Sequence, residues 1–155
     1  MKTLIVFYSR TGCTRSAAQE VGRLLGADLE ELRETEDRSG AGGYLRAGRD
    51  AMCKRTSELH PTTRRPEAYD LVILGTPVWG FTVCPAIRTW LMLEAANLKS
   101  VAFLCTQGGS GAERTQAEMT EITGKVPVAR LVLRDRDIRG NACADAIAAF
   151  AEACR

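Results

Sequence analysis

The chain has 155 residues, a length that suits one domain with a sizeable core. Its hydrophobic content of 45% and charged content of 26% are ordinary for a globular protein, and its net charge of +2 is too small to indicate a nucleic-acid partner. The apolar run at the N-terminus is too short for a membrane span, so none is expected.

Apolar, β-branched runs alternate with stretches of helical periodicity. The expected strands are residues 3–8, 28–32, 71–75, 101–105 and 128–133, and the expected helices are residues 13–25, 85–96, 112–122 and 143–153. An extended polar connection occupies about residues 33–69, with a helical stripe at Tyr44, Gly48, Ala51 and Met52. The alternation predicts an α/β fold, a three-layer sandwich with a mainly parallel sheet, as a single domain over residues 1–155.

The six cysteines include no C-x-x-C pair, and His60 is the only histidine that could complete a zinc site. This spacing argues against a metal centre. Several cysteines stand in apolar or helical contexts, where a reduced thiol packs as a small hydrophobic group. We therefore expect reduced cysteines and a cytoplasmic location.

Three polar, glycine-containing segments follow three of the expected strands. They are S-R-T-G-C-T at residues 9–14, T-P-V-W-G at residues 76–80 and T-Q-G-G-S-G at residues 106–111. An open parallel sheet binds its ligands beyond the carboxyl ends of its strands, where the strand order reverses. We therefore expect the three segments to gather around one ligand.

The first segment is suited to a phosphate. Ser9, Thr11 and Thr14 offer hydroxyls, and Gly12 permits close approach of the backbone. The helix that follows directs its unpaired N–H groups and the positive end of its dipole at the same turn. The segment has neither a P-loop lysine nor a G-x-G-x-x-G pattern, so it suits a terminal monophosphate. The alternative is a plain helix cap, in which the hydroxyls serve only the backbone.

The other two segments are suited to a flat ring. Trp79 can stack on a planar cofactor, and Gly108, Gly109 and Gly111 let the backbone lie against such a ligand. Taken alone, Trp79 is equally compatible with a place in the core, and the glycines with an ordinary turn.

Together, the segments resemble the flavodoxin-like FMN-binding family, of the short-chain flavodoxin type. S-R-T-G-C-T matches the S/T-x-T-G-x-T phosphate loop of that family at every fixed position. The resemblance is strongest in residues 3–25, 70–95 and 100–112, and weak in residues 33–69. It implies FMN as the cofactor and a five-stranded parallel sheet in the order 2-1-3-4-5.

The resemblance also assigns the contacts of the cofactor, and it places the chemistry on FMN rather than on a catalytic side chain. The phosphate would lie on Ser9, Arg10, Thr11, Gly12, Cys13 and Thr14, and the ribityl chain on Thr76 and Pro77. Val78, Trp79 and Gly80 would flank the isoalloxazine ring, and Thr106, Gln107, Gly108 and Gly109 would border its pyrimidine side. Gly80 is the candidate contact to the flavin N5, because glycine tolerates either orientation of the peptide.

These expectations favour a one-electron carrier between redox partner proteins. Such carriers are usually strongly acidic, whereas this chain is nearly balanced and its long connection is basic, with Arg46, Arg49, Lys54, Arg55, Arg64 and Arg65. Those residues are either a solvated face or a dock for an acidic partner or for the phosphate of NADPH. An NAD(P)H-dependent flavin or quinone reductase is therefore the alternative, and a binding module without flavin is the third interpretation.

Overall fold

The computed structural model describes residues 1–35, 40, 42–43, 45–46, 49 and 55–155. This part of the chain is centred on five parallel strands: β1 (Thr3–Phe7), β2 (Asp28–Glu31), β3 (Leu71–Trp79), β5 (Val101–Gln107) and β6 (Arg130–Arg134). They lie in the order β2-β1-β3-β5-β6, and a short strand, β4 (Thr82–Val83), pairs antiparallel with the end of β3. The predicted α/β class and the predicted order of the parallel strands are confirmed.

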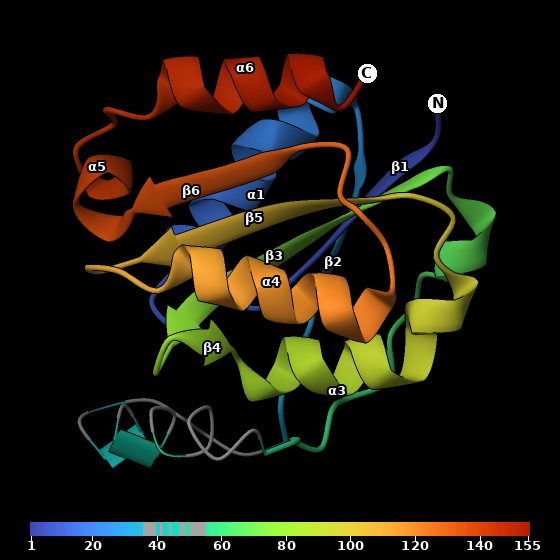
Figure 1. Ribbon diagram of the computed structural model, residues 1–155. Coiled ribbons are helices and arrows are strands. Elements are labelled where there is room, and N and C mark those ends of the chain that lie inside the picture. The colour runs from blue at the N-terminus through green and yellow to red at the C-terminus, as the bar shows by residue number, and fades with distance from the viewer. Residues whose placement is uncertain (36–39, 41, 44, 47–48, 50–54) are drawn as a thin grey trace.

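Helices cover both faces of the sheet and give the three layers seen in Figure 1. Helices α1 (Cys13–Leu25) and α6 (Ala144–Ala153) lie on one face, and α3 (Pro85–Glu94) and α4 (Ala112–Thr123) lie on the other. Each face has its own hydrophobic cluster, because successive residues of a strand point to opposite sides. In β1, Ile5 belongs to the cluster with α1 and α6, whereas Leu4 and Val6 belong to the cluster with α3 and α4.

The main departures from the predicted elements occur at the carboxyl ends of strands. Residues 76–79 and 106–107, expected in loops, continue β3 and β5. Pro77 suggested a loop, but it lies beyond Gly75, the last residue of β3 that pairs with β1, so its missing N–H costs no bond on that side. The strand then turns back into β4, a hairpin that was not predicted. The short helix α5 (Asp135–Arg139) was also not predicted, and β6 begins at Arg130 rather than at residue 128.

The described residues of the long connection lie along the β2 edge of the sheet. Glu34 forms an isolated antiparallel bridge with Leu59. Glu30 of β2 accepts hydrogen bonds from the backbone amides of Thr63 and Arg64 at 3.1 and 2.9 Å. Two 3-10 helices, η1 (Pro66–Ala68) and η2 (Ala95–Asn97), precede β3 and β5. The predicted helical stripe of Tyr44, Gly48, Ala51 and Met52 lies outside the described residues.

Within the described residues, no helix is long and apolar enough to cross a membrane.

Candidate functional site

The three predicted segments meet at one edge of the sheet. Strands β1, β3 and β5 are parallel neighbours, so their carboxyl ends lie together, on the side to which the arrowheads of β3, β5 and β6 point in Figure 1. The register places Phe7 beside Gly75 and Pro77 beside Thr106. Residues 9–14, 76–80 and 106–111 therefore share one surface, which we call the carboxyl edge.

The first segment forms a tight turn into α1. Gly12 precedes the helix with a φ of 98°, a left-handed conformation that glycine adopts without strain. The hydroxyl oxygen of Ser9 accepts hydrogen bonds from the amides of Gly12 and Arg15 at 3.1 and 3.2 Å, which is the capping role of the alternative interpretation. Cys13 and Thr14 are the first helical residues, so their amides have no intrahelical acceptor and are available to an anion.

A buried pair of hydroxyls joins the first segment to the third. The side-chain oxygens of Thr14 and Thr106 are 2.8 Å apart, and both residues are almost completely buried. Gly75 makes this approach possible, because a Cβ at that position would lie 2.8 Å from the Cβ of Phe7 and 3.4 Å from the Cγ2 of Thr14. The start of α1 can therefore lie directly against the end of β3.

The second segment is the tip of the β3–β4 hairpin. Strand β4 pairs with the last two residues of β3, which leaves Gly80 and Phe81 as a two-residue turn. Their φ angles of 57° and 62° are both positive, as a type I′ hairpin turn requires. Trp79 is half-buried and meets Tyr8 edge-on, with ring centroids 5.4 Å apart and ring planes at 88°. This contact orients the indole that we predict beside the cofactor ring.

The third segment runs from the end of β5 to the start of α4. The amide oxygen of Gln107 accepts a hydrogen bond from the first amide of α4 at 3.0 Å, so this side chain caps the helix. A Cβ at Gly111, which has a φ of 108°, would lie 2.7 Å from the Phe81 ring, so the segment packs against the hairpin. A Cβ at Gly108 or Gly109 would meet nothing within 4 Å. The packing of the protein itself therefore does not require glycine at these two positions. The open space beside them leaves room for a ligand.

The predicted cofactor contacts differ in how exposed they are to solvent. The buried ones are Cys13, Thr14, Thr76 and Thr106. The half-buried ones are Ser9, Arg10, Gly12, Pro77, Val78, Trp79 and Gln107, and the exposed ones are Thr11, Gly80, Gly108 and Gly109. All of them belong to the three segments of the carboxyl edge, and their contact with a cofactor stays a prediction.

Two buried thiols lie close to this edge, Cys105 on β5 and Cys84 between β4 and α3. Burial raises the pKa of Cys84 to about 11 and the pKa of Cys105 to about 12, so both thiols are protonated at neutral pH. The hydroxyl of Thr76 lies 3.3 Å from the sulfur of Cys84 and 2.9 Å from the carbonyl oxygen of Pro77, so it is engaged within the fold. Both cysteines therefore pack as apolar groups rather than as nucleophiles.

The described part of the chain offers no group of three or more His, Cys, Asp or Glu side chains that could hold a metal ion. The five described cysteines, Cys13, Cys84, Cys105, Cys143 and Cys154, are free thiols.

The sequence did not reveal the polar groups that hold the hairpin. Arg88 of α3 and Glu118 of α4 are buried and form an ion pair at 3.0 Å beneath β4. Charged residues within helices are usually exposed, so no local signal marks this pair. The contact of Tyr8 with Trp79 was also not predicted. The sequence did hold a signal for it, because Tyr8 directly precedes Ser9 and so stands next to the predicted site.

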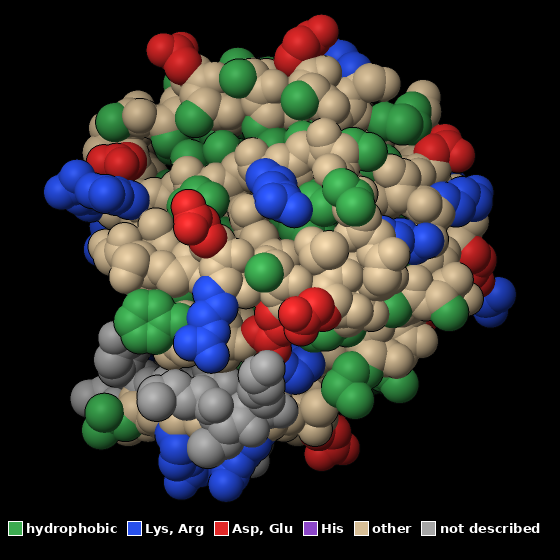
Figure 2. Space-filling model, in the orientation of Figure 1, with side chains coloured by type: hydrophobic (Ala, Val, Ile, Leu, Met, Phe, Trp, Pro, Cys, Tyr) green, Lys and Arg blue, Asp and Glu red, His purple; other side chains and the backbone are tan. Residues whose placement is uncertain are grey.

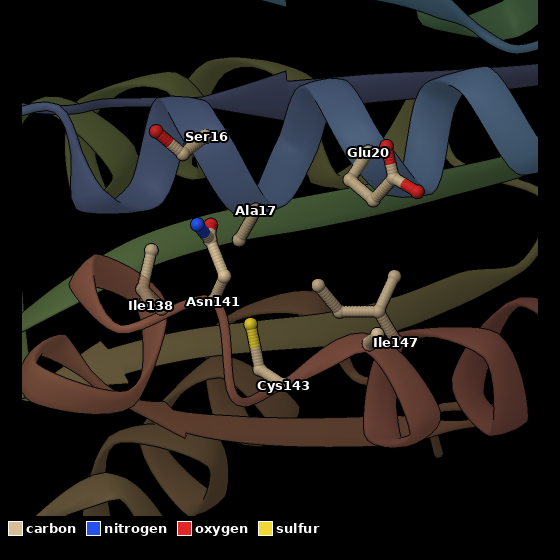
Figure 3. A pocket seen from close by; sticks show the side chains of 8 residues that line it. Ser16, Ala17, Glu20, Ile138, Asn141, Cys143 and Ile147 are labelled. Carbon is tan, nitrogen blue, oxygen red and sulfur yellow. The ribbon is translucent and has the colours of Figure 1, made fainter.

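Among the described residues, two cavities lie beside α5 and α6. One, of about 310 Å³, separates α1 from the turn between α5 and α6, and Figure 3 shows Asn141 and Cys143 directed from that turn toward Ala17. The other, of about 370 Å³, is lined by Gln107 together with residues of β6, α5, α6 and the turn between these helices. Neither is lined by Trp79, and Gln107 is the one predicted ring contact that lines either of these two cavities.

Solved structures with this fold cover nearly the whole chain. A flavoprotein from Lactobacillus acidophilus, determined in complex with FMN, is 23% identical with a TM-score of 0.73, and the match covers 90% of this chain and 97% of that chain. The two-electron reduced flavodoxin of Megasphaera elsdenii is 20% identical with a TM-score of 0.62, and the match covers 99% of each chain. A WrbA-like flavodoxin from Agrobacterium tumefaciens is 13% identical with a TM-score of 0.54, covering 97% of this chain and 98% of that chain.

At these identities, the structural likeness establishes the fold. No curated protein matches the chain. A sequence model of the flavodoxin family matches residues 2–152, which is nearly the full length. The chain therefore belongs to the flavodoxin family.

Proposed function

We propose that the carboxyl edge binds FMN and that this flavodoxin is a one-electron carrier between redox partner proteins. The observation that carries the proposal is that three features meet at one edge of the sheet: the turn into α1 at residues 9–14, the indole of Trp79, and the exposed glycines Gly108 and Gly109. Flavodoxin itself is an established example of a doubly wound sheet that holds FMN where the strand order reverses. The FMN in the Lactobacillus acidophilus flavoprotein supports the same cofactor here.

The first segment supplies donors for a phosphate without a lysine. The amides of Cys13 and Thr14 lie at the positive end of α1, where an anion is stabilised. Thr106 can donate its hydroxyl hydrogen to Thr14, which frees Thr14 to donate its own to the phosphate. Ser9 accepts two backbone hydrogen bonds and still has its hydroxyl hydrogen to donate.

The hairpin and the third segment would enclose the flavin ring. FMN supplies the redox chemistry when bound, and the protein supplies orientation and electrostatic surroundings. Trp79 offers an aromatic face, and the open space at Gly108 and Gly109 admits a flat ligand. The predicted ring contacts are all uncharged, so the site disfavours an added negative charge. Gly80, exposed at the turn, can present either its N–H or its carbonyl to the flavin N5.

A second candidate is an NAD(P)H-dependent flavin or quinone reductase. The observation that favours it is the charge balance: the net charge is +2, and Figure 2 shows Lys and Arg side chains interspersed with Asp and Glu. A carrier that docks on basic partners usually presents an acidic face instead. Among the basic residues of the connection, Arg64 is engaged with Asp28 at 3.3 Å, so it is not simply a free docking group.

Titration of the purified protein with FMN tests the proposal. We expect saturable binding of one FMN per chain, seen as a shift of the visible absorbance bands and as quenching of the flavin fluorescence by Trp79. A protein that stays colourless and ignores FMN would favour the binding module without flavin. With FMN bound, steady NADPH oxidation in the presence of a quinone would favour the reductase, whereas reduction only through a partner protein would favour the carrier.

A further inference from the structure

Two buried charged side chains outside the predicted cofactor contacts hold the hairpin that carries Trp79 and Gly80. Arg88 on α3 and Glu118 on α4 are 4% and 9% exposed, and they form an ion pair at 3.0 Å. Burying a charge is costly unless it is paired and fully hydrogen-bonded. The partners that satisfy these two charges are concentrated on β4.

Each residue of β4 is bonded by both charged groups. The hydroxyl of Thr82 donates to the carboxylate of Glu118 and accepts from Nη2 of Arg88 at 3.0 Å. The amide of Val83 donates to Oε2 of Glu118 at 3.1 Å, and its carbonyl accepts from Nη2 of Arg88 at 2.9 Å. Nη1 of Arg88 donates to the carbonyl of Arg55 at 3.0 Å. One guanidinium therefore joins the hairpin, α3, α4 and the end of the long connection.

The hairpin needs such support. Its ladder joins two residues of β3 to two residues of β4, which is too short to be stable on its own. Its turn contains Phe81 at a φ of 62°, an unfavourable conformation for a bulky residue. A buried ion pair adds little net stability compared with apolar side chains of similar volume, so stability alone does not explain charges at this place.

The register connects the pair to the proposed site. Thr82 is the cross-strand partner of Trp79, and Val83 is the partner of Val78. Thr82 and Val83, which bond to both charged side chains, are thus the direct cross-strand neighbours of the predicted ring contacts Trp79 and Val78. Any movement of β4 moves Val78 and Trp79 with it.

We propose that Arg88 and Glu118 are positioning residues of the flavin site, which fix β4 and thereby hold residues 78–80 against the flavin ring. The inference rests on the proposed function, because it presumes that FMN binds at the carboxyl edge. Neither residue is itself among the predicted contacts, so their effect on the flavin passes through the hairpin.

The test uses the double variant Arg88→Met/Glu118→Leu, which removes both charges together and replaces them with apolar side chains that such sites tolerate. Dissociation constants for FMN and for riboflavin, which lacks the phosphate, are measured by flavin fluorescence. We expect both affinities to fall by about tenfold, because a pre-organised contact surface is lost while the phosphate turn is untouched. The visible circular dichroism of the bound flavin should change as well.

The matched control is Gln116→Leu, which removes a buried polar group from the same helix. Gln116 donates to the carbonyl of Leu131 in β6 at 3.4 Å, not to the hairpin, so we expect unchanged flavin affinity. If the folded double variant binds FMN and riboflavin as the wild type does, with the same circular dichroism, the pair is structural only. If the wild type binds no FMN, the proposed function fails first, and the inference fails with it.

A second measurement does not depend on the flavin. The amide of Val83 donates to Glu118, so its hydrogen exchange in the cofactor-free protein should be faster in the double variant by about tenfold. Should the double variant not fold, Thr82→Val removes the hydroxyl that both charges share at similar side-chain volume, and the same loss of flavin affinity is expected. In Thr82→Val, an unchanged hydrogen-exchange rate at the Val83 amide together with an unchanged affinity for FMN would overturn the proposal.

Discussion

The phosphate turn and the hairpin lie side by side at the carboxyl edge but are held in different ways. The turn is built by neighbours in sequence: Ser9 accepts hydrogen bonds from amides three and six residues later. The hairpin is held by Glu118, whose bonds to Thr82 and Val83 span 36 and 35 residues. The turn is thus a local structure that a short motif can encode, whereas the hairpin depends on the packing of two helices.

This difference predicts how each region fails. A substitution on the exposed side of the turn should change ligand binding with little effect on the fold, because the hydrogen bonds of Ser9 that shape the turn are local. The buried Thr14 is the exception, since its hydroxyl also bonds to Thr106. A substitution beneath the hairpin should change stability and binding together, because the same side chains serve both.

The largest effect is expected from Glu118→Leu alone. It leaves the Arg88 guanidinium buried without its carboxylate, which costs about 3–5 kcal/mol of unfolding free energy. Urea unfolding measures this loss, and Arg88→Met/Glu118→Leu is the control, since it removes the stranded charge and should be clearly more stable than the single variant. A single variant as stable as the double one would mean that water reaches the guanidinium.

Thr14→Val tests the turn. Loss of a hydroxyl that donates to a phosphate should weaken FMN binding by about 1–3 kcal/mol, with riboflavin binding nearly unchanged. The variant also leaves the buried Thr106 hydroxyl without its partner, so the free energy of unfolding should fall as well, and affinities are compared on the folded protein. Fluorescence titration with both ligands measures this. Ser16→Ala is the control, because the exposed hydroxyl of Ser16 donates to the carbonyl of Gly12 and should not affect binding. Unchanged FMN affinity in Thr14→Val would leave Thr14 only as the buried hydrogen-bond partner of Thr106.

Alkaline pH tests whether the base of the hairpin is closed to water. Cys84 follows β4 directly, and burial raises its pKa from 9.0 to about 11. The folded state therefore keeps a proton that the unfolded chain loses, so this contribution to stability is complete below pH 9.0 and falls as the pH rises toward 11. At pH 10 the loss is about 1.4 kcal/mol.

Urea unfolding at pH 8 and pH 10 measures that loss, with Cys84→Ala as the reference. We expect the wild type to lose more stability than the variant over this interval. Equal losses in the two proteins would show that the Cys84 thiol ionises in the folded state, and hence that the hairpin base is open to solvent.

The smallest effect concerns the turn of the hairpin. Because Phe81 has a φ of 62°, Phe81→Gly should be more stable than Phe81→Ala by about 1 kcal/mol. Both variants lack the aromatic ring, so their difference in unfolding free energy isolates the backbone conformation. A Phe81→Ala protein as stable as Phe81→Gly would argue against a left-handed residue at this position.

The fold was largely predictable because its signals are local and repeated. The bounds of α1 followed from its periodicity and from Gly26, which ends the helix in a left-handed conformation. The order of the parallel strands came with the resemblance carried by residues 9–14. The strand ends were predicted less well, because Thr76 and Pro77 look like loop residues until the pairing of β3 with β5 is known.

The supports of the site could not be predicted from the sequence. Thr14 and Thr106 were both assigned to the cofactor, but nothing in a pair 92 residues apart indicates that their hydroxyls bond. Arg88 and Glu118 stand in amphipathic helices, where charged residues normally face water. Their burial depends on how α3 and α4 pack over β4, which is a property of the assembled fold.

A crystal structure of the protein grown with excess FMN tests the central claim most directly. We expect the phosphate to lie at the amides of Cys13 and Thr14, and the isoalloxazine ring to lie between Trp79 and the backbone of Gly108 and Gly109. A carboxyl edge that stays empty under these conditions, or flavin density at another place on the molecule, would contradict the assignment of this edge as the FMN site.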